Sequence, residues 1–223
     1  MAFPLEQFEF DAKRRALLAA GVRMMDPAAV YVEDTVQVGA GTLLLPGTIL
    51  RGETVIGRDC QIGPNAMLVD CVVGDGSCVN ASQGQDSRIG ARCEIGPYAH
   101  LRAHSVVGDD SKIGAFVQLK NCNLGPGTKM AHLTYVGDTD AGPGCNFGCG
   151  SVTCNYDGKV KARTTIGANV FIGCHTRFIP PVSVGDGAYI AAGTTLTQDV
   201  PPDSFVIGRS RQTVKLDWKD KRG

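Results

Sequence analysis

The sequence predicts an all-β solenoid, a parallel β-helix with triangular coils and a short helix ahead of them. The first observation is a strict six-residue spacing of aliphatic residues, many of them followed by Gly, as in Ile89, Ile95, Leu101, Val107, Ile113 and Leu119 and again from Ile166 to Leu196. A period of six fits neither a helix nor a heptad coiled coil, whereas short strands with one inward residue per side accommodate it. The second observation is composition: aromatic residues make up 6% of the chain and Gly numbers 29. A narrow aliphatic core turned at glycine-rich corners needs this mixture.

The elements follow in order along the 223 residues. Residues 1–46 are expected to form a helix from Asp11 to about Ala20, with Gly21 as its left-handed stop, and an extended lead-in. Residues 47–200 are expected to form roughly eight or nine coils of about 18 residues each. Residues 155–161 should stand out as a loop, and the extra residues between Val79 and Ile89, including Gly84, predict a bulge. Residues 201–223 are expected to form a tail of mixed charge that begins at Pro201 and Pro202.

Composition excludes several partners. Lys+Arg and Asp+Glu both number 22, so the formal net charge is zero and no basic field exists for nucleic acid. No apolar run is long enough to span a bilayer and no signal peptide is recognisable, so we expect no membrane partner and a cytoplasmic location.

The nine cysteines predict reduced thiols rather than a zinc site. They contain no CxxC pair, and the cluster Cys145, Cys149 and Cys154 matches no common zinc spacing. Strand geometry should scatter these three over different faces. Most of the others fall inside the periodic region as small core fillers.

Four histidines are present, and only His132 has a chemically suggestive context. His100, His104 and His175 are interpreted as solvated corner residues. A catalytic zinc, which needs three well-placed ligands, is not expected. His132 lies in a polar segment close in sequence to Cys154-Asn155-Tyr156-Asp157-Gly158. Spacing alone leaves two readings open, a catalytic base or a hydrogen-bonded surface residue.

The segments His132-Leu133-Thr134-Tyr135, Thr153 to Gly158, Ala191 to Thr195 and Gly208-Arg209 resemble a known bacterial family. This is the C-terminal acetyltransferase domain of the bifunctional N-acetylglucosamine-1-phosphate uridyltransferase/glucosamine-1-phosphate acetyltransferase. The resemblance is strongest from about Ile95 to Arg209. It implies a left-handed β-helix, a homotrimer, and N-acetylation of glucosamine-1-phosphate by acetyl-CoA without a required metal. The family's N-terminal nucleotidyltransferase domain has no counterpart in this sequence, so no uridyltransferase activity is expected.

The resemblance also implies roles for individual residues. His132 matches the general base. The residues that match sugar-phosphate contacts are Arg102, Lys120, Tyr135, Asn146 and Lys161. The residues at positions that match acetyl-CoA contacts are Cys149, Asn155, Tyr156, Cys174, Ala192 and Arg209. Three cations suit a phosphate, and an imidazole can deprotonate an amine for attack on a thioester.

Three residues depart from the family pattern. Gln118 stands where Glu is common, and Cys149 and Cys174 replace small residues. These changes bear on rate and acyl preference. Two alternatives to the expected function remain: acetylation of another amino sugar, including a nucleotide-linked one, and a non-catalytic trimeric scaffold.

Overall fold

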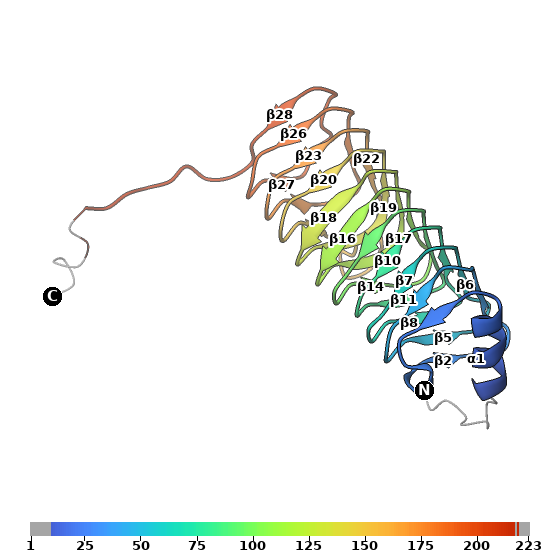
Figure 1. The fold of residues 1–223 in the computed structure, drawn as a ribbon. Helices are drawn as coiled ribbons and strands as arrows, with labels where there is room; N and C mark the ends of the chain where they lie inside the picture. The colour runs from blue at the N-terminus through green and yellow to red at the C-terminus, as the bar shows by residue number, and fades with distance from the viewer. Residues whose placement is uncertain (1–9, 217, 219–223) are drawn as a thin grey trace.

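The computed structural model describes residues 10–216 and 218. These residues form a long triangular prism of short parallel strands that stack coil upon coil (Figure 1). The predicted left-handed parallel β-helix with a short N-terminal helix is confirmed. Every coil buries its inward side chains against the coils above and below, as in other solenoids.

The first face of the prism is an 11-stranded parallel sheet. Its strands are β1 (Arg23–Met24), β4 (Leu43–Leu44), β7 (Gln61–Ile62), β10 (Cys78–Val79), β13 (Glu94–Ile95), β16 (Lys112–Ala115), β18 (Lys129–His132), β20 (Asn146–Phe147), β23 (Phe171–Ile172), β26 (Tyr189–Ile190) and β28 (Phe205–Val206).

The second and third faces together form a 17-stranded sheet, because two long strands run through both. The second face contains β2 (Tyr31–Val32), β5 (Ile49–Arg51), β8 (Met67–Val69), β11 (Gln83–Gln85), β14 (His100–Leu101), β17 (Gln118–Leu124), β19 (Tyr135–Ala141), β21 (Val152–Thr153), β24 (Arg177–Phe178) and β27 (Thr195–Leu196). The third face contains β3 (Gln37–Val38), β6 (Val55–Ile56), β9 (Val72–Val73), β12 (Ser87–Ile89), β15 (Ser105–Val107), β22 (Thr164–Ile166) and β25 (Val182–Val184), and it shares β17 and β19 with the second.

Side chains alternate inward and outward on each face, which is why one aliphatic residue per side suffices. On the second face Leu101, Leu119 and Val136 stack in register on successive coils and are buried. Their neighbours Gln118 and Tyr135 point outward and are half-buried. An outward column of polar residues therefore accompanies each inward column of aliphatic residues.

The bulge predicted between Val79 and Ile89 is wrong. Gly84 occupies a regular inward position in β11 and pairs with Leu68 and Leu101. A Cβ at Gly84 would lie 2.9 Å from Leu68 Cδ2 and 3.1 Å from Cys71 Sγ, so these larger neighbours already fill its space. Counting aliphatic residues misses an inward position that a glycine fills.

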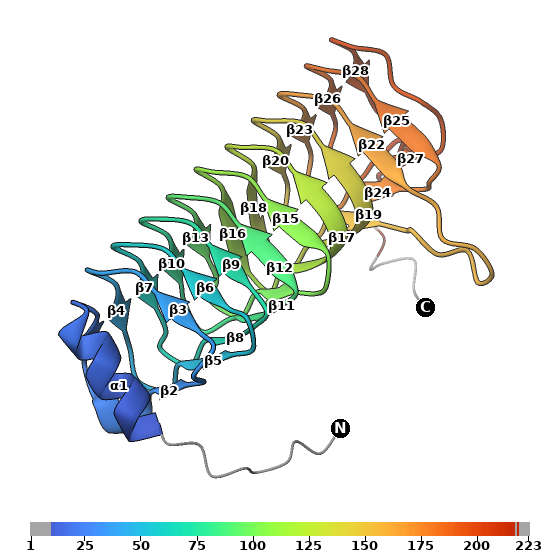
Figure 2. The same cartoon turned by 90° about the vertical axis from the view of Figure 1, so that its right-hand side faces the viewer.

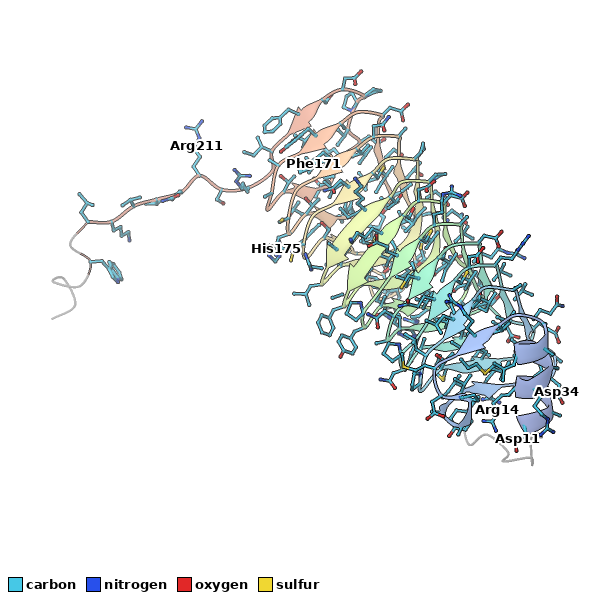
Figure 3. All side chains as sticks on the ribbon, viewed as in Figure 1. Asp11, Arg14, Asp34, Phe171, His175 and Arg211 are labelled. Carbon is cyan, nitrogen blue, oxygen red and sulfur yellow. The ribbon has the colours of Figure 1, made fainter. Side chains whose placement is uncertain are left out.

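The ends of the solenoid lie outside the 47–200 segment expected from the repeat. Helix α1 (Phe10–Ala19) and the 3-10 helix η1 (Pro27–Ala29) lie beside β1 and β2, and Gly21 has φ +89° as expected. Strand β28 adds one more rung after Pro202. The tail then runs away from the prism, carrying Arg211 with it (Figure 3). Parts of the predicted lead-in and tail, residues 1–9, 217 and 219–223, lie outside the described residues. In the described part of the chain, no helix has the length and apolarity to cross a membrane.

Candidate active site

A vertical row of residues runs along the corner between the first and second faces. We call it the His132 column, and its members on successive coils are His132, Cys149, Cys174, Ala192 and Arg209. The His132 carbonyl accepts from Gly150 N at 3.2 Å, and the carbonyls of Cys149 and Cys174 accept from the next coils at 2.7 Å. Arg209 Nη1 donates to the Ala192 carbonyl at 2.5 Å. The structure thus aligns the predicted base with four of the residues predicted to contact acetyl-CoA.

The imidazole of His132 is exposed at the end of β18, where the chain turns toward the second face. The main-chain carbonyl of His132 also accepts a hydrogen bond from Thr134 Oγ1 at 2.8 Å, which fixes the backbone of the turn. Tyr135 begins β19 three residues later. The corner therefore places His132 and Tyr135 within one coil, on either side of the same edge of the prism.

Three residues predicted to bind the sugar phosphate lie on the second face. Arg102 N donates to the Leu119 carbonyl at 2.9 Å, so Arg102 lies one coil from Lys120. Lys120 pairs with Gly137, and Gln118 with Tyr135, across β17 and β19. Arg102, Lys120 and Tyr135 therefore project from adjacent rungs of one surface.

A buried carboxylate, Asp138, joins two of the predicted site residues. Lys120 Nζ lies 3.2 Å from Asp138 Oδ1 and 3.3 Å from Oδ2. Asn121 Nδ2 donates to Oδ1 at 2.6 Å, and Asn155 Nδ2 donates to Oδ2. Burial raises the pKa of Asp138, but these three donors outweigh that effect and the net pKa lies below the usual value. The ionised carboxylate of Asp138 thus holds the Lys120 ammonium and the Asn155 amide next to each other.

Gly137 provides the space in which this cluster and Tyr135 meet. A Cβ at Gly137 would lie 2.4 Å from Tyr135 Oη and 2.9 Å from Asn155 Nδ2. The phenol ring therefore lies over the glycine, next to the amide. Gly137 N donates to Thr153 Oγ1 at 2.7 Å, which anchors the backbone below.

The segment after β21 leaves the prism as a hairpin, confirming the loop predicted at residues 155–161 (Figure 2). Tyr156 and Lys161 form an antiparallel bridge, and Asp157 Oδ1 accepts from Lys159 N and Val160 N at 2.7 Å. Tyr156 and Lys161 are exposed. Asn155 is the buried foot of this hairpin, and its contact with Asp138 ties the loop to the second face.

Asn146 is the predicted site residue that the single chain leaves apart. It belongs to β20 on the first face, in register with Lys129 and Phe171. Lys120, Tyr135 and Asn155 all lie beyond the corner.

The other histidines differ partly from expectation. His104 and His175 are exposed corner residues, and His104 Nδ1 lies 3.0 Å from Asp86 Oδ2. Figure 3 shows His175 projecting from the edge of the prism. The corner predicted for His100 is wrong: it lies on strand β14, in register with Gln118. His100 directly precedes the buried Leu101, so it holds an outward position on the strand and not a position in the turn.

The three cysteines of the sequence cluster lie apart, as strand geometry predicted. All nine cysteines are free, and Cys145, Cys149 and Cys154 lie at three separate places: a buried corner, the His132 column and the exposed end of the second face. Among residues 10–216 and 218, no three His, Cys, Asp or Glu side chains gather closely enough to hold a metal ion.

Comparisons with known proteins place the chain in a family. A model described as the GMPPB C-terminal domain matches residues 27–140, and one described as bacterial transferase hexapeptide (six repeats) matches residues 163–198. The chain belongs to the GMPPB C-terminal domain family. Among curated proteins, Bifunctional protein GlmU from Brevibacillus brevis is 44% identical over 97% of this chain and 48% of its own length. The protein of the same name from Mycobacterium marinum is 45% identical over 98% of this chain and 45% of its own length.

The chain therefore spans about half the length of the curated relatives it matches. Among solved structures, a UDP-N-acetylglucosamine acyltransferase from Bacteroides fragilis has a TM-score of 0.48 at 14% identity, over 81% of this chain and 70% of that one. The family match and the 44% and 45% identity to the two curated relatives confirm the resemblance noted from the sequence.

Sequence reasoning missed two residues of the site, Asp138 and Asn121. Both lie at the corner between the second and third faces and both have positive φ, 48° in each case. The available signal was a pair of Asx residues at equivalent corners of adjacent coils, since Asn and Asp tolerate this conformation.

Proposed function

We propose that this chain transfers the acetyl group of acetyl-CoA to the amine of glucosamine-1-phosphate, giving N-acetylglucosamine-1-phosphate and CoA. The observation that carries the proposal is the convergence of Lys120, Tyr135 and Asn155 on the second face, which begins just after the turn that bears His132. The match to the bacterial transferase hexapeptide model and the similarity to relatives named Bifunctional protein GlmU support a transfer reaction of this kind.

In the proposed reaction His132 acts as the general base. The unprotonated sugar amine attacks the carbonyl carbon of the thioester, and the neutral imidazole accepts the proton that the nitrogen loses as the C–N bond forms. The C–N bond forms, the tetrahedral intermediate collapses, and the C–S bond breaks. The imidazolium returns its proton to the departing thiolate, so that both substrates and the enzyme end in balanced protonation states.

Cations on the second face supply the phosphate site in this scheme. Arg102 is exposed and offers several donors to a phosphate, while Lys120 contributes a point charge that Asp138 holds in place. Lys161 adds a third charge from the exposed hairpin. Tyr135 lies between the cations and His132, where its hydroxyl can hydrogen-bond the sugar.

The His132 column is the proposed path of acetyl-CoA. Cys149, Cys174 and Ala192 rise from the base, one coil at a time, and Arg209 ends the row with a charge suited to the CoA phosphates. A thioester at the lower end of this path would meet the imidazole. A backbone N–H near Cys149 is the proposed donor to the oxyanion.

We further propose that the chain works as a homotrimer in the cytoplasm. Asn146 lies on a different face from the other sugar-binding candidates, so a neighbouring copy would have to bring its own Asn146 to the site. A seam between prisms would also enclose the exposed His132 column.

The test is an assay of the purified chain with acetyl-CoA and glucosamine-1-phosphate. CoA and the acetylated sugar should be quantified by chromatography, because the exposed thiols of Cys154 and Cys174 would react with colorimetric thiol reagents. We expect turnover by the wild type and a loss of about 100-fold or more in His132→Ala, with His104→Ala as the matched control at wild-type rate. UDP-glucosamine and glucosamine-6-phosphate are compared as acceptors. A chain inactive on glucosamine-1-phosphate, or an active His132→Ala variant, would refute the proposal.

A further inference from the structure

We propose that Asp138 is a positioning residue that fixes the Lys120 ammonium and the Asn155 amide with one carboxylate, and so sets the phosphate site and the acyl-donor site relative to each other. This inference rests on the proposed function, because it assigns Lys120 to one substrate and Asn155 to the other. Asp138 itself is 6% exposed and would touch neither substrate.

The two carboxylate oxygens divide their partners in a way that couples the groups. Oδ1 accepts from Asn121, Oδ2 accepts from Asn155, and Lys120 lies at similar distances from both, 3.2 and 3.3 Å. Any rotation of the carboxylate that improved one contact would lengthen the others. Three chain segments, β17, β19 and the foot of the hairpin, are therefore oriented by one side chain.

An ionised carboxylate suits this position, and the isosteric amide does not. All three partners are donors, so an asparagine would turn its NH₂ group toward either Asn121 or Asn155. The substitution would also leave the ammonium of Lys120, whose side chain is 21% exposed, without its counter-charge. Asp138 has φ 48°, which Asp and Asn both tolerate, so the backbone conformation does not itself oppose the change.

The same strand offers a matched control two residues further on. Asp140 also carries a carboxylate with two side-chain partners, Asn123 and Arg163, but it faces the third side of the prism. Asp140→Asn removes a comparable charge from β19 without touching Lys120 or Asn155. A general loss of stability in β19 should affect both variants, whereas a positioning role belongs to Asp138 alone.

The first measurement is steady-state kinetics of full-length Asp138→Asn and Asp140→Asn with both substrates varied. We expect kcat/KM to fall by about 10- to 100-fold in Asp138→Asn, with KM raised for the amino sugar and for acetyl-CoA together. Asp140→Asn should keep both KM values. In a double-mutant cycle, Lys120→Ala should cost much less in the Asp138→Asn background than in the wild type.

The second measurement does not depend on turnover. Trace labelling with acetic anhydride, followed by peptide mass mapping, reports how freely the Lys120 amine reacts. Labelling of Lys120 should be several-fold faster in Asp138→Asn than in wild type or Asp140→Asn. Should Asp138→Asn fail to fold, Asn121→Ala removes a single donor to Oδ1 and should show the same changes at smaller size.

Wild-type KM values and a wild-type Lys120 labelling rate in Asp138→Asn would overturn the inference, as would equal effects of Asp138→Asn and Asp140→Asn. If the wild type does not transfer acetyl groups but Lys120 is labelled faster in Asp138→Asn, the proposed function is wrong, whereas the contact by which Asp138 positions Lys120 is supported. The two failures are therefore distinguishable.

Discussion

Adding one methyl group at Gly137 should disable the site while leaving the solenoid folded. The alanine Cβ would lie 2.4 Å from Tyr135 Oη, 2.8 Å from its Cζ and 2.9 Å from Asn155 Nδ2. An ordinary contact requires about 3.4 Å, so the phenol must move by about 1 Å, a displacement that can lower a rate by about 100-fold. Gly137 has no positive φ, so crowding rather than backbone strain causes the effect.

The assay compares kcat/KM for acetyl transfer and the thermal unfolding midpoint in Gly137→Ala and wild type. We expect about 100-fold lower kcat/KM and a loss of roughly 1–3 kcal/mol in stability from overpacking. Tyr135→Phe supplies the internal control. Without the hydroxyl the shortest contact disappears, so the same alanine should cost less in that background. An unchanged kcat/KM in Gly137→Ala, or an equal cost in both backgrounds, would refute the reasoning.

Three further predictions concern the scaffold. Phe178 is fully buried, so Phe178→Ala should lower the free energy of unfolding by about 3–5 kcal/mol in urea titrations, against about 1 kcal/mol for Phe171→Ala, a residue that is 40% exposed. The hydrogen bond from Arg163 lowers the pKa of Asp140, so this ion pair stabilises the fold above about pH 4 and the stabilisation is lost as the pH falls through the lowered pKa. The free energy of unfolding, measured by urea titration from pH 7 to pH 3, should therefore decrease less in Asp140→Asn than in wild type. Iodoacetamide at pH 8 should modify exposed Cys174 and spare Cys122, whose thiol pKa burial raises to about 11, as peptide mapping of the folded chain would reveal.

The fold was predictable because its signal is repeated many times. Because the six-residue period recurs many times, an error at one position does not change the predicted fold. Once the inward positions are known, the positions of the corners follow. The misreading at Gly84 shows the limit of this approach. The six-residue pattern detects only large inward side chains. The core of a coil is filled by several residues together, and here Leu68 and Cys71 occupy the space next to Gly84.

The sequence predicted those site residues whose own side chains are expected to contact a substrate. It did not predict the residue that positions other side chains. His132, Lys120 and Asn155 carry groups whose chemistry suggests a role. Asp138 carries a group that the sequence presents as one more surface acid among many. Its role depends on Asn121 from the preceding coil and Asn155 from the following one, which are 17 residues away on either side. Spacing in sequence does not reveal such stacking until the length of each coil is known.

The position of Asn146 is not explained by a sugar site built within a single chain. Its register with Lys129 fixes it on the first face, and the corner that bears His132 separates it from Tyr135 and Lys120. A rigid solenoid cannot bend one face onto another, because successive coils are hydrogen-bonded to one another along each face. If Asn146 contacts the sugar, the contact must therefore come from a second copy whose first face lies against this chain's second face. Mixing Asn146→Ala chains with His132→Ala chains tests this directly: sites that draw the two residues from different chains would regain activity, whereas sites built within one chain would stay inactive.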